Sequence, residues 1–289
     1  MGNALFEKGR EGFLDGTLDW DTNTFKAALL DLNTADAGIK AVSGATNATP
    51  IVLTVTANGF ANGDIVVVGG VGGNLAANGI WKVAAQATNT ISLTDPITGA
   101  NVVGSGAYTS GGYVVCLGPS AAGDNWDDFD GALVGTAQTL TTPTVVAGVA
   151  DADDVTYSAV SGATVEAIGI YKDTGTASTS RMAAFVDGRH IVTCAAQAAS
   201  SATTVAVERL AAGIPNGTVL AFSNGASATL SALANAGDRT ITVTALAAII
   251  TAGSRADAPA TSSGLPVTPN GGSITITWSN DPATKIFKL

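Results

Sequence analysis

Apolar and small polar residues alternate along most of this 289-residue chain, and this is the period of a half-buried β-strand. The clearest case occurs twice, at residues 204–212 and 240–248, with an offset of 36 residues. Ile214 and Gly217 of the first copy fall on Ile250 and Gly253 of the second. Each copy therefore predicts a strand followed by a Gly turn. Two copies make a module rather than a solenoid, and its Ala, Thr, Val, Ser and Gly content indicates a structural or interaction element.

A second segment, residues 46–117, predicts successive short strands. They lie at residues 51–56, 64–68, 79–84, 90–93 and 113–117, with an Asn62-Gly63 turn before the second. We expect a small β-barrel or sandwich. Its glycine run, residues 69–73, is followed by neither Lys-Ser nor Lys-Thr, so a hairpin loop is favoured over a phosphate-binding loop.

The rest of the chain also carries strand patterns. They occupy residues 18–32, 155–160, 165–171, 182–186, 273–278 and 285–289, and the last one is apolar enough to require burial by pairing with a partner. Helix is expected to be a minority. The predicted fold is mainly β, with a β-sandwich or jelly-roll-like host domain interrupted by two small β modules.

The distribution of charge places the boundaries. Residues 46–117 carry a net charge of −1 and residues 189–259 carry +1, so the host carries the whole net charge of −10. We therefore predict a discontinuous host of residues 1–45, 118–188 and 260–289, a barrel insert at 46–117 and a two-copy repeat insert at 189–259. With 46% hydrophobic and 12% charged residues, the chain is expected to form packed cores.

The same features limit the partners. An acidic chain without basic clusters argues against nucleic acid as a ligand. Cys116 and Cys194 have no metal-site spacing, and we expect two buried free thiols. The charged first twenty residues contain no signal-peptide core, and no later stretch is long enough to span a membrane. A soluble protein made in the cytoplasm is expected.

Candidate chemistry is sparse. His190 is the sole histidine and has no nucleophile motif near it, so we predict no catalytic residue, no cofactor and no enzyme activity. Two acidic clusters, Asp124, Asp127, Asp128 and Asp130 around Trp126, and Asp151, Asp153 and Asp154, raise the alternatives of glycoside hydrolysis or Ca²⁺ binding. Neither has the spacing of a calcium loop, and solvated turns with Asp capping backbone amides are favoured, with no metal site assigned.

The N-terminal stretch is apolar and glycine-punctuated. Its candidate assembly contacts are Leu5, Phe6, Arg10, Phe13 and Leu14. It packs on its own domain or reaches a neighbouring subunit, and both possibilities stay open. We expect a homo-oligomer, dimer or trimer, and expect deletion of residues 1–14 to spare the fold.

Several host stretches resemble a family of tailed-bacteriophage virion proteins. They are residues 4–21, 150–157, 170–175, 264–272 and 285–289, which include Gly9-Arg10-Glu11-Gly12-Phe13-Leu14 and Lys285-Ile286-Phe287-Lys288-Leu289. The first insert, from Ile51-Val52-Leu53-Thr54 to Tyr108-Thr109-Ser110-Gly111-Gly112, resembles the small β-barrel of the ubiquitin-activating-enzyme FCCH type. The second is similar to the Ala/Thr/Gly-rich repeats of phage capsid and tail proteins.

This resemblance implies a non-enzymatic virion protein. The expected role is a capsid decoration or cement protein that binds the major capsid protein or other virion proteins and stabilises the head. A tail or fibre component, or a virion module that binds or cleaves glycans through Trp126 and its neighbouring acids, is the alternative.

Overall fold

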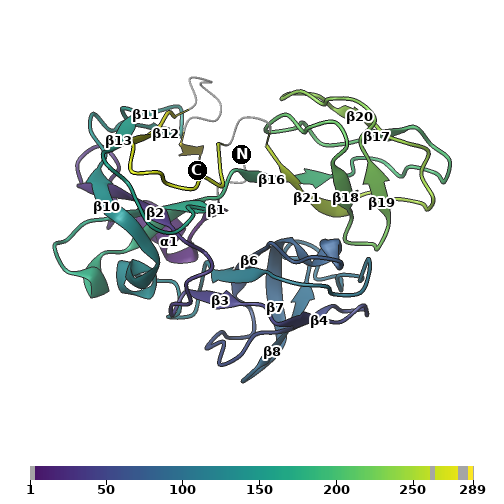
Figure 1. The fold of residues 1–289 in the computed structure, drawn as a ribbon, viewed down its shortest axis with the longest axis horizontal. Coiled ribbons are helices and arrows are strands. Elements are labelled where there is room, and N and C mark those ends of the chain that lie inside the picture. Colours follow the sequence, from purple (N-terminus) through teal and green to yellow (C-terminus); the bar gives the residue numbers. More distant parts are fainter. Residues whose placement is uncertain (1–3, 261–263, 279–285, 289) are drawn as a thin grey trace. The chain divides into compact units, whose positions relative to one another are not determined.

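The computed structural model describes residues 4–260, 264–278 and 286–288. The predicted mainly β fold is confirmed: antiparallel strands dominate, and the described residues contain one α-helix (Figure 1). Contacts divide the chain into two compact units. The host unit consists of Asn3–Ile39, Cys116–Asp187 and Gly264–Leu289, and the insert unit contains Lys40–Val115 and Gly188–Ser263.

A five-stranded antiparallel sheet is the centre of the host unit. Its order is β1 (Ala4–Leu5), β15 (Met182–Val186), β14 (Ala167–Lys172), β2 (Phe25–Leu30) and β10 (Leu133–Thr139). Every residue of β2 except Lys26 is buried, because this strand lies inside the sheet and is covered on both faces. Three 3-10 turns, η2 (Trp126–Asp128), η3 (Asp130–Ala132) and η4 (Ala177–Thr179), lie in its connections.

The helix α1 (Glu7–Asp15) lies where the sequence predicted only an apolar arm. Its glycines are typical of loops, but here they allow close packing. A Cβ atom on Gly9 would lie 2.6 Å from the carbonyl oxygen of Ala183 in β15. The helix backbone therefore rests directly on the sheet, and the helix ends at Gly16, whose φ of 78° is left-handed.

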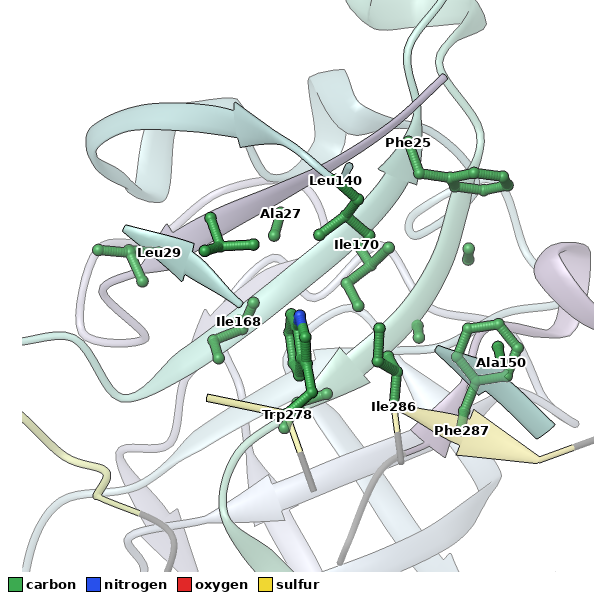
Figure 2. Close-up of a cluster of buried hydrophobic side chains, with 14 of the residues drawn as sticks. Phe25, Ala27, Leu29, Leu140, Ala150, Ile168, Ile170, Trp278, Ile286 and Phe287 are labelled. Carbon is green, nitrogen blue, oxygen red and sulfur yellow. The ribbon is translucent and has the colours of Figure 1, made fainter. Parts of the chain in front are cut away.

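Smaller sheets complete the host unit. One has the order β11 (Thr144–Val146), β12 (Val149–Asp151) and β23 (Phe287–Lys288), and another pairs β13 (Val155–Tyr157) with β22 (Ile274–Ile276). The final strand is paired, as its apolar pattern predicts, and the neighbour that β23 uses is β12 of its own chain. Ile286 and Phe287 enter the core beside Ile170 and Trp278 (Figure 2).

The first insert forms a seven-stranded antiparallel sheet. Its order is β3 (Ile39–Ala41), β9 (Tyr113–Cys116), β6 (Ile65–Gly69), β7 (Gly79–Ala87), β8 (Thr90–Thr94), β5 (Val52–Thr54) and β4 (Gly44–Ala45). The predicted strands are thus present. The glycine run lies in the connection between the antiparallel strands β6 and β7, together with η1 (Leu75–Ala77), and this confirms the hairpin-loop interpretation.

The second insert has an internal two-fold symmetry that follows its 36-residue repeat. Its strand pairs are β16 (Arg189–Thr193) with β21 (Arg255–Pro259), β17 (Thr204–Ala206) with β20 (Thr240–Thr242), and β18 (Val219–Ala221) with β19 (Ser227–Thr229). Val205 and Ile241 are equivalent residues of the two copies and face each other in the β17–β20 pair. Thr193 pairs with Arg255. The residue 36 positions after Thr193 is Thr229, the residue 36 positions before Arg255 is Val219, and these two residues also pair with each other.

The backbone hydrogen bonds obey the same symmetry. Three pairs of bonds are related by the 36-residue shift. In the first pair, the amide of Cys194 donates to the oxygen of Ser254 and that of Leu230 donates to Thr218, both at 2.9 Å. The other two pairs are Glu208 to Thr193 (2.8 Å) with Thr244 to Thr229 (2.9 Å), and Ala198 to Ile250 (2.9 Å) with Ala234 to Ile214 (3.1 Å). Several of these bonds join one copy to the other. The two copies therefore fold as one interlocked body around a shared core.

Each insert begins and ends on neighbouring antiparallel strands. The first does so through β3 and β9, and the second through β16 and β21. The two inserts are grouped in one compact unit, where the amide of Val103 donates to the oxygen of Ser223 at 2.9 Å and Arg255 Nη1 lies 3.8 Å from Asp95 Oδ2. Whether each insert also folds separately, as the sequence predicts, stays a prediction.

Candidate functional site

The predicted assembly residues lie in β1, in α1 and, for Phe6, between the two elements of the host unit, and several are part of its core. Phe6 is fully buried, and its ring meets that of Phe129 edge-on at 5.3 Å. Leu5 is half-buried in β1, which pairs with β15. The amide of Glu7 donates to the oxygen of Leu117 at 2.7 Å. In contrast to the expectation from the sequence, we therefore expect the deletion of residues 1–14 to destabilise the host unit, because it would uncover this core.

The other assembly candidates offer more surface. Leu14 is 89% exposed at the end of α1, and Arg10 forms an exposed ion pair with Glu7. Phe13 is partly buried and packs between Phe25, at 6.3 Å, and Phe287, at 5.4 Å. Of the five predicted residues, Arg10 and Leu14 are exposed and Leu5 and Phe13 are exposed in part, whereas the structure itself tests no assembly.

A groove of about 270 Å³ opens beside Phe13 in the host unit. It is lined by Phe13, Leu18, Trp20, Val145, Ala150 and Phe287, together with Gly16, Asp19 and Gly148. Contacts within the host unit fix the position of Trp20 in the wall of the groove. Its indole Nε1 donates to the oxygen of Asp151 at 2.9 Å, and its ring meets that of Phe287 edge-on at 5.0 Å. The groove is thus a preformed apolar surface with one carboxylate at its edge.

The strand β11 borders this groove and is the main feature that the sequence analysis missed. Val145 is 49% exposed and Val146 is 68% exposed, although both belong to an apolar stretch. A signal was present. Val146 and Val149 flank Ala147-Gly148, and both central residues have positive φ, 53° and 77°, as in a two-residue hairpin turn. An alternating segment around a Gly-containing dipeptide predicts this hairpin.

The first acidic cluster forms local turns. Asp128 closes a capping box with Asn125 around η2, and burial raises the pKa of its carboxyl group. Trp126 is only 7% exposed and stacks on Tyr171, with ring centroids 4.4 Å apart. It is therefore not an open platform for a sugar ring, which weakens the glycan alternative.

The second acidic cluster is likewise engaged in turns. Asp153 accepts hydrogen bonds from the hydroxyls of Thr141 and Thr142, at 3.2 and 2.6 Å, and Asp154 accepts one from the amide of Trp278 at 3.0 Å. Within the described residues, no group of three or more His, Cys, Asp or Glu side chains is placed to hold a metal ion.

His190 lies in β16 and is 1% exposed. Neither ring nitrogen has a hydrogen-bond partner among the described residues, and burial lowers the pKa to about 4. The imidazole is therefore neutral at pH 7 and is not hydrogen-bonded to a nucleophile or a carboxylate in the part of the chain that the structure describes. Cys116 and Cys194 are both buried, as predicted, and neither forms a disulfide in the part of the chain that the structure describes.

No protein-family model matches the chain, and no curated protein matches it either. Among the helices of the described residues, none has the length and apolar character that a membrane crossing requires.

Proposed function

We propose that this chain is a non-enzymatic structural protein of a bacteriophage virion, and specifically a capsid decoration or cement protein. The observation that carries the proposal is an apolar groove on an otherwise acidic host unit, lined by Phe13 and by Val145 of the exposed strand β11. Exposed apolar positions that line a preformed groove are typical of protein interaction surfaces. The host stretches that resemble virion proteins include α1, which contributes Phe13 to this groove.

The role follows from the linkage between binding and assembly. A protein that binds the assembled shell and not its free subunits stabilises the shell by about 2.7 kcal/mol per site when its free concentration is one hundred times the dissociation constant. The partner is the major capsid protein or another virion protein. In this role the inserts act as added modules that supply bulk and rigidity, the first through its seven-stranded sheet and the second through its interlocked copies.

Two measurements test the proposal. Quantitative gel staining of purified virions should give a copy number near that of the major capsid protein. Capsids prepared without the chain should rupture at a lower temperature than capsids to which it is added back. A copy number of a few per virion would favour the tail or fibre alternative, and capsids that neither bind the protein nor gain heat resistance would exclude the cement role.

A further inference from the structure

The outer edge of β11 has hydrogen-bonding groups that its own sheet does not use. In the pairing with β12, Val145 faces Ala150. The oxygen of Ala150 accepts a bond from the amide of Ile286 at 3.1 Å, so the polar groups of Ala150 point toward β23. In an antiparallel pair, the groups of the two facing residues then point away from each other. The N–H and C=O groups of Val145 therefore point outward from the sheet.

The side chains at this edge are also suited to an added strand. All three β11 residues are exposed, and the side chain of Val145 lines the groove with Phe13 and Trp20. A strand paired with β11 would place a side chain about 5 Å from Val145 on the same face, at the groove. An exposed apolar edge of this kind is a template for another chain.

The charge near the groove identifies the occupant. Asp19 lines it, and Asp15 and Asp21 are exposed neighbours in the sequence that form no ion pair among the described residues. The hydrogen bond with Asp19 and that neighbour's negative charge raise the pKa of Asp21, as expected where negative charge is concentrated. Two cations lie next to this region, where Lys172 and Arg181 donate to Thr17 at 2.9 and 3.1 Å. Hydrogen bonds from Thr17 and the positive charge of Arg181 lower the pKa of Asp15, so Asp19 and Asp21 carry the negative charge that matters for the groove.

A second copy of this chain fits the surface poorly. The host segments carry the whole net charge of −10, so pairing two host units would bring like charges together. A three-residue edge is also far too short for the roughly 1,200 Å² that a stable interface buries. A cationic segment has neither disadvantage, because its apolar side chains fill the groove while its basic side chains meet the carboxylates.

We propose that the β11 edge and the adjacent groove bind an extended, positively charged segment of a partner protein, which adds to β11 as a fourth strand of the β11–β12–β23 sheet. This inference rests on the surface alone and does not require the virion role.

The test uses the full-length protein and two synthetic seven-residue peptides that alternate Lys or Glu with Val and one central Phe. Calorimetric titration should show binding of the Lys peptide, weakened at least tenfold between 50 and 500 mM salt, and at least tenfold weaker binding of the Glu peptide. Val145→Pro removes an outward N–H without loss of a ladder bond, and should weaken binding of the Lys peptide at least tenfold. Val145→Thr, the matched control, keeps that N–H and should lose less than threefold.

A readout on the unaltered protein covers the case in which Val145→Pro fails to fold. Hydrogen exchange of the Val145 amide should slow at least tenfold when the Lys peptide is added, whereas the Val146 amide, already bonded in the hairpin, should not change. Equal binding of both peptides, or an unchanged Val145 amide, would overturn the proposal. The proposal would also be overturned if neither peptide binds and the protein forms a dimer that Val145→Pro dissociates. That result would show that a second copy of the chain occupies the β11 edge.

Discussion

At the scale of single residues, the glycines of α1 determine how the N-terminal segment packs. Gly9 meets the backbone of β15 and Gly12 meets the side chain of Leu18, at distances that leave no space for a Cβ atom. The low helix propensity of glycine is thus offset by contacts that only glycine permits. The helix places Phe13 in the wall of the groove to which we assign partner binding.

Substituting Gly9 with Ala should therefore destabilise the protein, despite the higher helix propensity of Ala. We expect a loss of about 1–3 kcal/mol from overpacking against the Ala183 carbonyl, measured by urea unfolding. Glu11→Ala, at an exposed position of the same helix, should change stability by less than about 0.5 kcal/mol. A stabilised Gly9→Ala variant would show that the helix does not rest on β15.

His190 predicts a particular dependence of stability on pH. Its pKa is about 4 in the folded protein, below the 6.5 of an exposed histidine, so the unfolded chain binds this proton more readily. Above pH 6.5 the ring is neutral in both states and does not lower the free energy of unfolding. As the pH falls from 6.5 toward 4, the unfolded chain takes up the proton first, and the free energy of unfolding decreases by about 3 kcal/mol at most.

Unfolding by urea at pH 7.5 and pH 4.5 measures this contribution. The wild type should lose more stability between the two conditions than His190→Leu, in which this ionisation is absent. Because carboxylates titrate in both proteins, the difference between the two isolates the histidine. Identical losses would contradict the assignment.

At the scale of elements, the second insert behaves as two subunits joined in one chain. Leu210 and Leu246 are equivalent residues of the two copies, and both are buried in the shared core. Each donates its amide to the other copy, Leu210 to Asp238 at 2.9 Å and Leu246 to Ala202 at 3.0 Å. Neither copy can complete its hydrogen bonding without the other.

Truncating either leucine should therefore have the same effect. Leu210→Ala and Leu246→Ala should each cost about 2–5 kcal/mol and should unfold the whole insert rather than one half. Leu233→Ala, at an exposed position of the same insert, is the matched control and should cost less than about 0.5 kcal/mol. Hydrogen exchange shows which half opens, and opening confined to the mutated copy would argue against the interlocked fold.

The elements also show what the sequence can and cannot predict. Alternation located β5 to β9 and β15, because each strand has its own pattern. Pairing is not written in any one strand: nothing in Lys285-Ile286-Phe287 specifies β12 as its neighbour. The accessibility of Val145 and Val146, and hence the candidate binding surface, depends on such pairings. The α1 helix was missed because packing overrode the local propensity of its glycines.

At the scale of the whole molecule, the host unit holds residues that the charge pattern assigned to the first insert. Cys116 donates its amide to Gly38 at 2.9 Å, and Leu117 accepts from Glu7. The contact boundary between Val115 and Cys116 therefore lies two residues before the predicted one. Because Val42 donates to Gly112 at 2.8 Å, the strands leading into and out of the insert lie together, and a short bridge can join them.

Excision of the first insert should depend on this boundary. Replacing residues 43–111 by a Gly-Ser bridge should leave a cooperative β protein. Replacing residues 46–117 instead should give a protein that melts several degrees lower than the first variant. The longer excision also removes the hydrogen bonds of Cys116 and Leu117, each worth about 1 kcal/mol. Thermal unfolding followed by circular dichroism compares the two proteins. Equal melting temperatures would place the boundary back at Leu117.

The joining of two equivalent copies in one polypeptide has a consequence for how this protein can diverge. Two identical subunits around a two-fold axis must present every residue twice, so any change alters both faces at once. Here Arg255 approaches Asp95 of the first insert, while its equivalent in the other copy is Val219, which lies exposed. Covalent duplication has released the copies from enforced identity. Selection can therefore adapt the Arg255 side of the second insert to its contact with the first insert, while the equivalent Val219 side can acquire a separate role.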